Sequence, residues 1–437
     1  MSDSVINVRF KIFKILFDNE VNFKRIDYLL SDSLHKNFSD SDVRFIHKVV
    51  YGVIRNRSKL DYYASIFYDG KYKKLLIKYK IILRIGIYQL FYMDSVPDYA
   101  AVNTTVDLCK KIDPSKQKLI NAIMRKISNN INVKDEKIDD LAIQFSHPQW
   151  LLDKWLKRWS LEKVLNLLEY NNKTPKIWFR INTLKISVLE FYALLDKHNI
   201  QFKKNDYLDA FFYSCSVQEL LSSSMMSDGL ISVQNPSNGL VVKLLNPKEG
   251  QTIFDGCSAP GGKTRYINEL TNGKSHINSY DIDEKRINLI SSYLKKNNIT
   301  NINCYKSDLS SEYLPSYDIG LVDVPCTGTG VLSKRVDIRW RRKKEDLLEM
   351  NKIQDSILNN VTKNLNPGGI LVYSTCSIEE EENWGIINSF LNSNKDFRLD
   401  NANNFIPNQY VDKNGCLSIF PFNGLDGIFA ARLIKND

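Results

Sequence analysis

Two of the seven cysteines lie in turns that directly follow apolar, strand-forming segments. The sequence DVPC carries Cys326 just after residues 319–323, and STCS carries Cys376 at the end of residues 370–375. In the usual doubly wound sheet the fourth and fifth strands are neighbours, about 5 Å apart. We therefore expect both thiols at one edge of a sheet. A zinc site is disfavoured and no metal is predicted, because the two cysteines are far apart in the sequence and no histidine lies near either.

Two neighbouring thiols suit the methylation of carbon 5 of cytosine, which is a poor nucleophile. A thiolate that adds to carbon 6 turns the ring into an enamine, and carbon 5 can then attack an electrophilic methyl group. A second group must help to remove the proton from carbon 5, so that the first thiol can leave. Asp323 could bond the base as charge develops on it. Methylation of an exocyclic nitrogen would instead call for Asn or Asp before Pro-Pro and an aromatic residue, so DVPC disfavours that chemistry.

A glycine-rich segment, DGCSAPGGKT at 255–264, lies between a predicted strand and a predicted helix. Open α/β sheets bind nucleotide-like ligands at such turns. A P-loop would need glycine where Cys257 stands, and a dinucleotide loop would need G-x-G-x-x-G, which is absent. The remaining alternative is an S-adenosylmethionine loop, whose turn cradles the amino acid end of the cofactor.

Acidic residues at successive strand ends favour the S-adenosylmethionine alternative. Asp281 follows the second strand and could accept both ribose hydroxyls. Asp308 follows the third strand and could meet the adenine amino group, and Asp323 closes the fourth. Any one of these acids alone is typical of a solvated turn. With Asp255 at the end of the first strand, acids stand at four successive strand ends, and solvated turns do not readily explain such a series.

The periodicity of the chain predicts a multidomain protein. Residues 1–130 show helical spacing and predict an all-α bundle, with 81–93 as its central buried helix. Residues 131–144 are polar and predict a linker, and 145–235 predict a small α+β module. Strands and helices alternate over 236–437, which predicts a doubly wound parallel sheet of the Rossmann-like α/β class. The strand candidates are 252–255, 276–281, 302–306, 319–323, 370–375, 417–420 and 428–433.

The charge of the chain is unevenly distributed. The 437 residues carry a net charge of +10, and residues 1–130 hold the whole surplus. A basic domain attached to a neutral body suggests an anionic partner, although drift of the composition towards lysine would give the same surplus. No apolar run is long enough to span a membrane and the N-terminus lacks a signal-peptide pattern, so no membrane association is expected. The cysteine pattern is typical of reduced thiols and predicts a cytoplasmic protein.

Several motifs together resemble a known family. DGCSAPGGKT, DVPCTGTG (323–330) and STCS (374–377) resemble three signature motifs of the RNA cytosine-5 methyltransferases. SHPQWL (146–151), FRINTLK (179–185) and VQNPSN (233–238) are similar to the segments that precede that catalytic domain. The N-terminal third resembles a NusB-like RNA-binding bundle, through 83–111 and 121–127. The resemblance covers nearly the whole chain.

The resemblance implies a role for each motif. Cys376 would be the nucleophile, and Cys326 would assist release of the product. The module at 145–235 would be a small RRM-like fold that contacts RNA, and 236–437 would be a class I methyltransferase domain. S-adenosyl-L-methionine would be held by Cys257, Ser258, Ala259, Pro260, Gly261, Gly262, Lys263, Asp281, Asp308 and Asp323. The chain departs from the family pattern at Gly256–Pro260, usually Leu-Cys-Ala-Ala-Pro, and at Arg335-Val336, usually His-Pro.

A cationic segment directly after the Cys326 motif supplies candidate RNA contacts. Cations can neutralise phosphates, and an aromatic ring can stack on a base. A solvated start of a helix is the alternative explanation for the same charges. The RNA-binding candidates are Lys334, Arg335, Arg339, Trp340, Arg341 and Arg342.

These observations predict an S-adenosylmethionine-dependent enzyme that methylates carbon 5 of one cytosine, and the family resemblance implies that this cytosine lies in 16S ribosomal RNA. Its partner would be that RNA or an early small-subunit particle, with no obligate protein partner. A transfer RNA substrate is the alternative within the same class. A non-catalytic RNA-binding factor is the alternative from another class, and the intact thiol pair and glycine-rich loop count against it.

Overall fold

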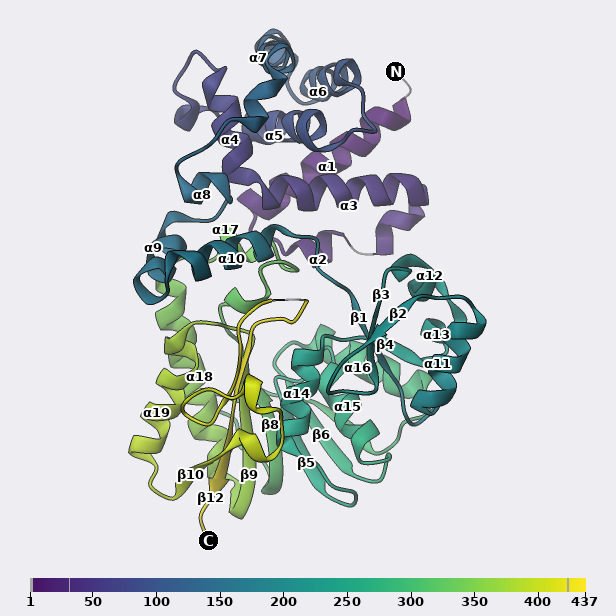
Figure 1. The fold of residues 1–437 in the computed structure, drawn as a ribbon, viewed down its shortest axis with the longest axis vertical. Helices are drawn as coiled ribbons and strands as arrows, with labels where there is room; N and C mark the ends of the chain where they lie inside the picture. Colours follow the sequence, from purple (N-terminus) through teal and green to yellow (C-terminus); the bar gives the residue numbers. More distant parts are fainter. Residues whose placement is uncertain (1–2, 31, 423) are drawn as a thin grey trace. The chain divides into compact units, whose positions relative to one another are not determined.

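The computed structural model describes residues 3–30, 32–422 and 424–437, and it divides into two compact units (Figure 1). Unit 1 comprises residues 1–173 together with 332–342. Unit 2 comprises residues 174–331 and 343–437. The cationic segment that follows the Cys326 motif therefore belongs to the same unit as the N-terminal bundle. No helix among the described residues is long and apolar enough to cross a membrane.

Unit 1 is helical and is built around α5 (Ile77–Tyr92), as the sequence predicts. This helix is buried nearly all round and packs against α1, α3, α4, α6 and α7 (Figure 1). Its one buried cation, Arg84, is paired with Asp61 at 2.7 Å and with Glu20 at 2.6 Å, which offsets the cost of removing the charge from water. The other helices are α1 (Asp3–Val21), α2 (Ile26–Leu29), α3 (Asp40–Arg55), α4 (Arg57–Ile66), α6 (Asp98–Ile112), α7 (Gln117–Asn129), α8 (Leu141–Gln144), α9 (Gln149–Arg158) and α10 (Leu161–Asn172).

The segment expected as a linker, 131–144, contains a short 3-10 turn (Ile131–Asp135) and helix α8. Val133 and Ile138 bury their side chains in the core of the bundle, which ties this polar stretch down. Helices α9 and α10, which the sequence analysis places in the α+β module, group with the bundle in unit 1.

The small sheet of unit 2 is antiparallel, in the order β2-β3-β1-β4. Its aromatic core includes Phe179, Phe191 and Phe212, all of them fully buried. The strands are β1 (Trp178–Ile181), β2 (Phe202–Lys204), β3 (Phe211–Ser214) and β4 (Ile231–Val233), with helices α11 (Val188–Lys197), α12 (Val217–Ser222) and α13 (Ser224–Ser227).

The large sheet runs β10-β12-β9-β8-β5-β6-β7, and β11 pairs with β12. Strands β5 to β9 are parallel, and β8 and β9 are neighbours as predicted. The expectation of an all-parallel sheet is wrong at one edge, because β12 pairs antiparallel with β9, and β10 was not predicted. The strands are β5 (Thr252–Gly256), β6 (His276–Asp281), β7 (Ile302–Lys306), β8 (Tyr317–Asp323), β9 (Leu365–Thr375), β10 (Phe397–Asp400), β11 (Leu417–Ile419) and β12 (Ile428–Lys435).

Helices cover both faces of this sheet, so its strands are nearly continuous apolar runs. One face packs against α14 (Pro236–Leu245), α15 (Gly262–Leu270) and α16 (Glu284–Lys296). The other face packs against α18 (Glu345–Lys363) and α19 (Trp384–Ser393). With both faces covered, the strand ends and the loops that follow them are the places where polar side chains can gather.

Candidate active site

The structure brings Cys326 and Cys376 together at the carboxyl edge of the large sheet. Asp323, the last residue of β8, lies opposite Ser374 on β9 in the parallel ladder. Cys326 lies in the turn after β8 and Cys376 in the turn after β9, and their sulfur atoms are 3.1 Å apart. Both cysteines carry thiols rather than a disulfide, and both are only partly exposed. The separation is that of a sulfur–sulfur hydrogen bond, so one thiol can donate a proton to the other.

The environment of the pair favours the protonated form of Cys326. The hydrogen bond to Cys376 raises the pKa of the Cys326 thiol well above its ordinary value, and burial raises it further. The negative charges of Glu382 and Asp323 act in the same direction. A pair of this kind resists carrying two thiolates at once.

A buried carboxylate, Glu382, connects the turns that carry the two cysteines. One oxygen accepts the backbone N–H of Thr327 at 2.7 Å and the amide of Gln354 at 3.0 Å. The other oxygen accepts the hydroxyls of Thr327 and Ser377. Thr327 follows Cys326 and Ser377 follows Cys376, so one side chain fixes both neighbours. The sequence analysis missed this residue.

Close packing of backbone also holds the Cys376 turn. The N–H of Gly330 donates to the carbonyl of Cys376 at 3.0 Å. A Cβ on Gly330 would lie 2.8 Å from that carbonyl oxygen and 2.4 Å from the carbonyl oxygen of Gly427. Only glycine fits here, which explains the last glycine of DVPCTGTG.

The glycine-rich loop follows β5 and opens α15. Gly261 precedes the helix with a φ of +86°, in the left-handed region that favours glycine. Asp255, the fourth residue of β5, is fully buried. Thr264 donates to one of its oxygens at 2.5 Å, and the other oxygen has no partner among the described residues. Burial raises the pKa of Asp255 to about 7. A cationic or hydrogen-bonding ligand in this loop would satisfy a carboxylate that the protein leaves half unbonded.

A motif residue from the small sheet supports the same loop. Arg180, from FRINTLK, is 1% exposed and donates to the carbonyl of Gly262 at 3.0 Å. It also forms a buried ion pair with Glu269 of α15 at 2.7 Å. The resemblance of FRINTLK therefore has a structural basis, since its arginine holds the start of α15.

Asp281, Asp308 and Asp323 lie at or just after the ends of β6, β7 and β8, as predicted. Each carboxylate has its own hydrogen-bond partners. Asp281 accepts the N–H groups of Ala259, at 3.1 Å, and Asp283, at 3.0 Å. Asp308 bonds to the backbone and hydroxyl of Ser310, and this hydroxyl bond holds the pKa of Asp308 below its usual value. Asp323 accepts from Lys263 of the glycine-rich loop and from Ser374, both at 2.7 Å. Lys263 thus joins the loop to the strand that leads to Cys326.

The prediction that Arg339 contacts RNA is wrong. This side chain is 1% exposed, within unit 1. Its guanidinium donates to the carbonyls of Asn171, at 3.0 Å, and Ser146, at 3.1 Å. It also donates to the side-chain oxygen of Asn172 at 2.9 Å and to the carbonyl of Arg55 at 3.4 Å. Through these hydrogen bonds Arg339 links α17 (Ile338–Arg341) to the helices of the bundle.

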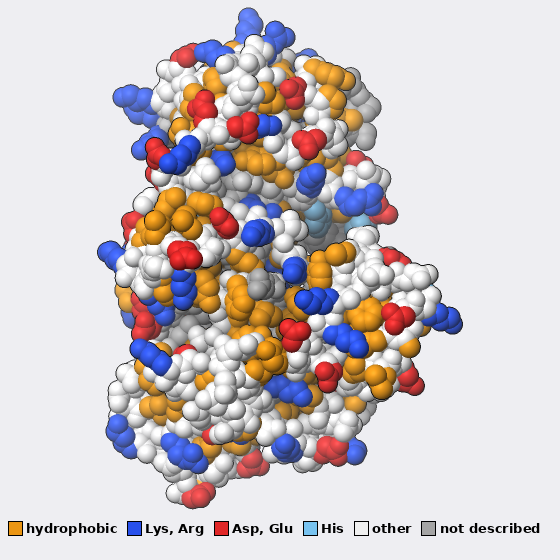
Figure 2. Space-filling view, in the orientation of Figure 1, with side chains coloured by type: hydrophobic (Ala, Val, Ile, Leu, Met, Phe, Trp, Pro, Cys, Tyr) orange, Lys and Arg blue, Asp and Glu red, His pale blue; other side chains and the backbone are white. Residues whose placement is uncertain are grey.

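Trp340 is partly buried and has contacts within unit 1, so its role in RNA binding stays a prediction. Its indole N–H donates to the carbonyl of Ile54 at 2.8 Å, and the guanidinium of Arg57 lies 5.1 Å from the centre of its ring. The remaining candidates, Lys334, Arg335, Arg341 and Arg342, line a cavity in unit 1. On the face drawn in Figure 2, lysine and arginine side chains are scattered among acidic and hydrophobic ones and form no continuous basic patch.

Comparisons with known proteins identify the family. Family models match residues 6–129 (NusB family), 147–212 (the ferredoxin-like domain of RsmF/B-like methyltransferases) and 242–434 (16S rRNA methyltransferase RsmB/F). Ribosomal RNA small subunit methyltransferase B from Proteus mirabilis is 33% identical, over 86% of this chain and 90% of the relative. The chain belongs to the ribosomal RNA small subunit methyltransferase B family. The protein of the same name from Photorhabdus laumondii is 32% identical, over 92% of each chain.

Solved structures agree with this assignment. A methyltransferase homolog protein from Pyrococcus horikoshii is 28% identical, with a TM-score of 0.59 over 67% of this chain and 97% of its own. The crystal structure of PH0851 covers 100% of both chains with a TM-score of 0.79, and at 22% identity it shows the fold alone. As a methyltransferase of this family, the protein uses S-adenosylmethionine as its cofactor. The half-bonded carboxylate of Asp255 in the glycine-rich loop fits the ammonium group of that cofactor.

Proposed function

We propose that this protein methylates carbon 5 of one cytosine in 16S ribosomal RNA. The observation that carries the proposal is the pair of thiols, 3.1 Å apart at the ends of β8 and β9, on the sheet edge that also carries the glycine-rich loop. The names of the bacterial relatives support ribosomal RNA of the small subunit as the substrate, in the cytoplasm. An amine-methylating site would have no use for a second thiol.

In the proposed reaction the sulfur of Cys376 bonds to carbon 6 of the cytosine. The electrons of the C5–C6 double bond then become available at carbon 5. The cofactor supplies an electrophilic methyl group, which carbon 5 takes up. Loss of the proton from carbon 5 restores the double bond and releases Cys376 as a thiolate. The target base must leave its stack, because both ring carbons have to be reached.

Cys326 is proposed to assist the last step. The largest cause that raises the pKa of Cys326 is the hydrogen bond to Cys376, followed by burial and then by the charge of that neighbour. The hydrogen bond and the charge are lost once Cys376 is bonded to carbon, whereas burial remains, so the pKa of Cys326 falls at the stage when a base is needed and its proton can pass to water. The sulfur of Cys326 can then accept the carbon 5 proton, directly or through water.

The cofactor is proposed to lie against residues 257–263, with Asp255 near its ammonium group and Asp281 and Asp308 near its nucleoside. Asp323 would face the base, because its carboxylate is at the strand end next to the Cys326 turn. Lys263 and Ser374 hold that carboxylate from two sides, which fixes its orientation before the RNA arrives.

The test is methyl transfer from labelled cofactor to purified 16S ribosomal RNA, followed by nucleoside analysis and bisulfite sequencing. We expect label in 5-methylcytidine at a single position. Label on an exocyclic nitrogen, or no transfer at all, would contradict the proposal. If transfer RNA is labelled and ribosomal RNA is not, the proposed chemistry would stand but the proposed substrate would be wrong.

A further inference from the structure

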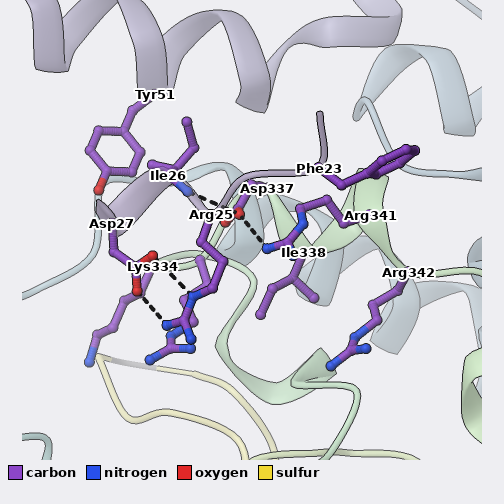
Figure 3. Close-up of a pocket in the computed structure, with 11 residues that line it drawn as sticks. Phe23, Arg25, Ile26, Asp27, Tyr51, Lys334, Asp337, Ile338, Arg341 and Arg342 are labelled. Carbon is purple, nitrogen blue, oxygen red and sulfur yellow. Dashed lines mark hydrogen bonds and ion pairs between the residues drawn. The ribbon is translucent and has the colours of Figure 1, made fainter. Parts of the chain in front are cut away.

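A cavity of about 510 Å³ lies within unit 1, between the start of the bundle and the cationic segment. One side of it is formed by Phe23, Arg25, Ile26, Asp27 and Tyr51 (Figure 3). The other side is formed by Lys334, Arg335, Asp337, Ile338, Arg341 and Arg342. Known pockets for small ligands span about 300–1,000 Å³, so the space is sufficient for one nucleotide unit. Nothing in the proposed chemistry uses this cavity.

The cationic segment is anchored firmly enough to form a fixed wall. Val336 is fully buried and belongs to the core of the bundle, as does the partly buried Trp340. The buried Arg339 adds the hydrogen bonds described above, and the guanidinium of Arg55 donates to the carbonyl of Ser333 at 3.2 Å. Because these side chains turn into the bundle, their neighbours Lys334 and Arg342 are left beside the cavity (Figure 3), and Arg335 also lines it.

More cationic than acidic side chains line the cavity. Its lining contains five cationic side chains and two carboxylates, Asp27 and Asp337, so positive charges outnumber negative ones by three. Arg25 pairs with Asp27, and Arg341 pairs with Asp337 at 3.3 Å. An aromatic ring, Phe23, also lines the cavity, and its side chain is 59% exposed. The cavity therefore joins a cationic lining to an accessible ring.

We propose that this cavity binds the phosphate backbone of the RNA substrate at a nucleotide other than the reacting cytosine, with Phe23 against a base. Surplus positive charge beside an exposed ring is the combination by which proteins hold single-stranded RNA. Arg335 places a permanent positive charge in the lining. The inference rests on the proposed function, because it takes RNA to be the substrate.

The test compares RNA affinity of Arg335→Glu, Arg335→Lys and the full-length wild type, with a transcript of 16S ribosomal RNA as the probe. We expect Arg335→Glu to weaken binding by about tenfold, roughly 1.4 kcal/mol. The slope of log affinity against log salt should fall by about 0.7 for each single-strand phosphate that the variant no longer neutralises. Arg335→Lys should retain most of the affinity. Arg398→Glu, an exposed position on β10 in unit 2 and outside the cavity, is the matched control for net charge and should leave the slope unchanged.

Equal affinity and slope for Arg335→Glu and wild type would overturn the inference. So would an equal loss of affinity in Arg398→Glu, because net charge alone would then explain it. If only binding to a small-subunit particle weakens and binding to naked RNA does not, the occupant is a protein and the inference is also wrong. These failures are distinguishable from failure of the proposed function, which is judged by methyl transfer from the wild-type protein.

A second inference comes from the buried carboxylate in unit 2. We propose that Glu382 is a positioning residue that sets the distance between the two thiols. It bonds to Thr327 and Ser377, which directly follow the two cysteines, and to Gln354 of α18. Asn383 adds to the same arrangement, since its amide donates to the carbonyl of Ser377 at 3.0 Å. Glu382 is fully buried and therefore acts through these turns.

The negative charge of Glu382 makes it possible to distinguish a positioning role from a purely structural one, because the pH dependence of thiol alkylation should change only in the first case. Its negative charge raises the pKa of the neighbouring Cys326 thiol. In Glu382→Gln we expect alkylation of the thiol pair to begin at lower pH than in wild type. We also expect kcat to fall by about 10-fold to 100-fold with little change in the KM for the cofactor, because misplaced reacting groups are costly. Glu381→Gln is the matched control, because Glu381 is the adjacent glutamate and is exposed.

Glu382→Asp should recover part of kcat, because the carboxylate remains but is one carbon shorter. An unchanged pH profile of alkylation together with unchanged kcat in Glu382→Gln would overturn this second inference. So would a loss of kcat that is matched by a lower melting temperature with no change in the alkylation profile, since Glu382 would then serve folding alone.

Discussion

Two consecutive polar segments follow β8, and the fold uses them differently. Residues 323–331 stay with the large sheet and carry Asp323 and Cys326 to its carboxyl edge. Residues 332–342 belong to the other compact unit, where Val336 and Arg339 turn into the helical bundle. The first segment is controlled by the geometry of a parallel sheet. In residues 332–342, no sheet geometry determines which cations face solvent and which are buried.

The largest effect is expected at the thiol pair. Cys376→Ala should lower methyl transfer by at least about 10³-fold, because no other group can form the bond to carbon 6. Affinity for the cofactor should stay close to that of wild type. Rates from labelled cofactor and affinities from calorimetry would check this. Equal loss of both properties would mean that Cys376 serves the fold instead of the chemistry.

A smaller effect, on stability, separates the two cations of the second segment. Arg339→Ala should reduce the free energy of unfolding of unit 1 by about 2–3 kcal/mol, because it leaves several buried oxygens without a donor. The exposed Arg335→Ala should stay within about 0.5 kcal/mol of wild type. Denaturant unfolding followed by circular dichroism would measure both. Similar values for the two variants would remove the distinction drawn between buried and exposed cations.

The next effect depends on pH and concerns the first strand of the large sheet. Burial raises the pKa of Asp255 from 3.8 to about 7, so the folded protein holds this proton more tightly than the unfolded chain does. The free energy of unfolding should therefore fall as pH rises from about 4 to 7, and level off above that. Asp255→Asn lacks this contribution. In the absence of cofactor, the melting temperature of wild type minus that of Asp255→Asn should decrease across this range, and a constant difference would contradict the assignment.

The thiol pair and the acids at strand ends could be predicted, because side chains that follow neighbouring parallel strands must meet at one edge. The antiparallel β12 could not, since its apolar run looks the same in either direction. Glu382 lies in the run Glu379–Glu382, and an acidic run is also typical of the start of a helix. Burial divides that run, because Glu380 and Glu381 are exposed whereas Glu379 and Glu382 are buried. For Glu382 the cause is tertiary packing, since its carboxylate accepts from Thr327 of the Cys326 turn, and the sequence does not show this contact.

The direct test of the central claim is a search for a covalent protein–RNA complex with the Cys326→Ala variant. With 16S ribosomal RNA and S-adenosylmethionine present, release should stall after Cys376 has bonded to carbon 6. We predict a band that survives denaturing electrophoresis with Cys326→Ala and is absent when Cys376→Ala is added to the same chain. No resistant band, or one that persists in the double variant, would contradict the account of two sulfur atoms acting on one pyrimidine.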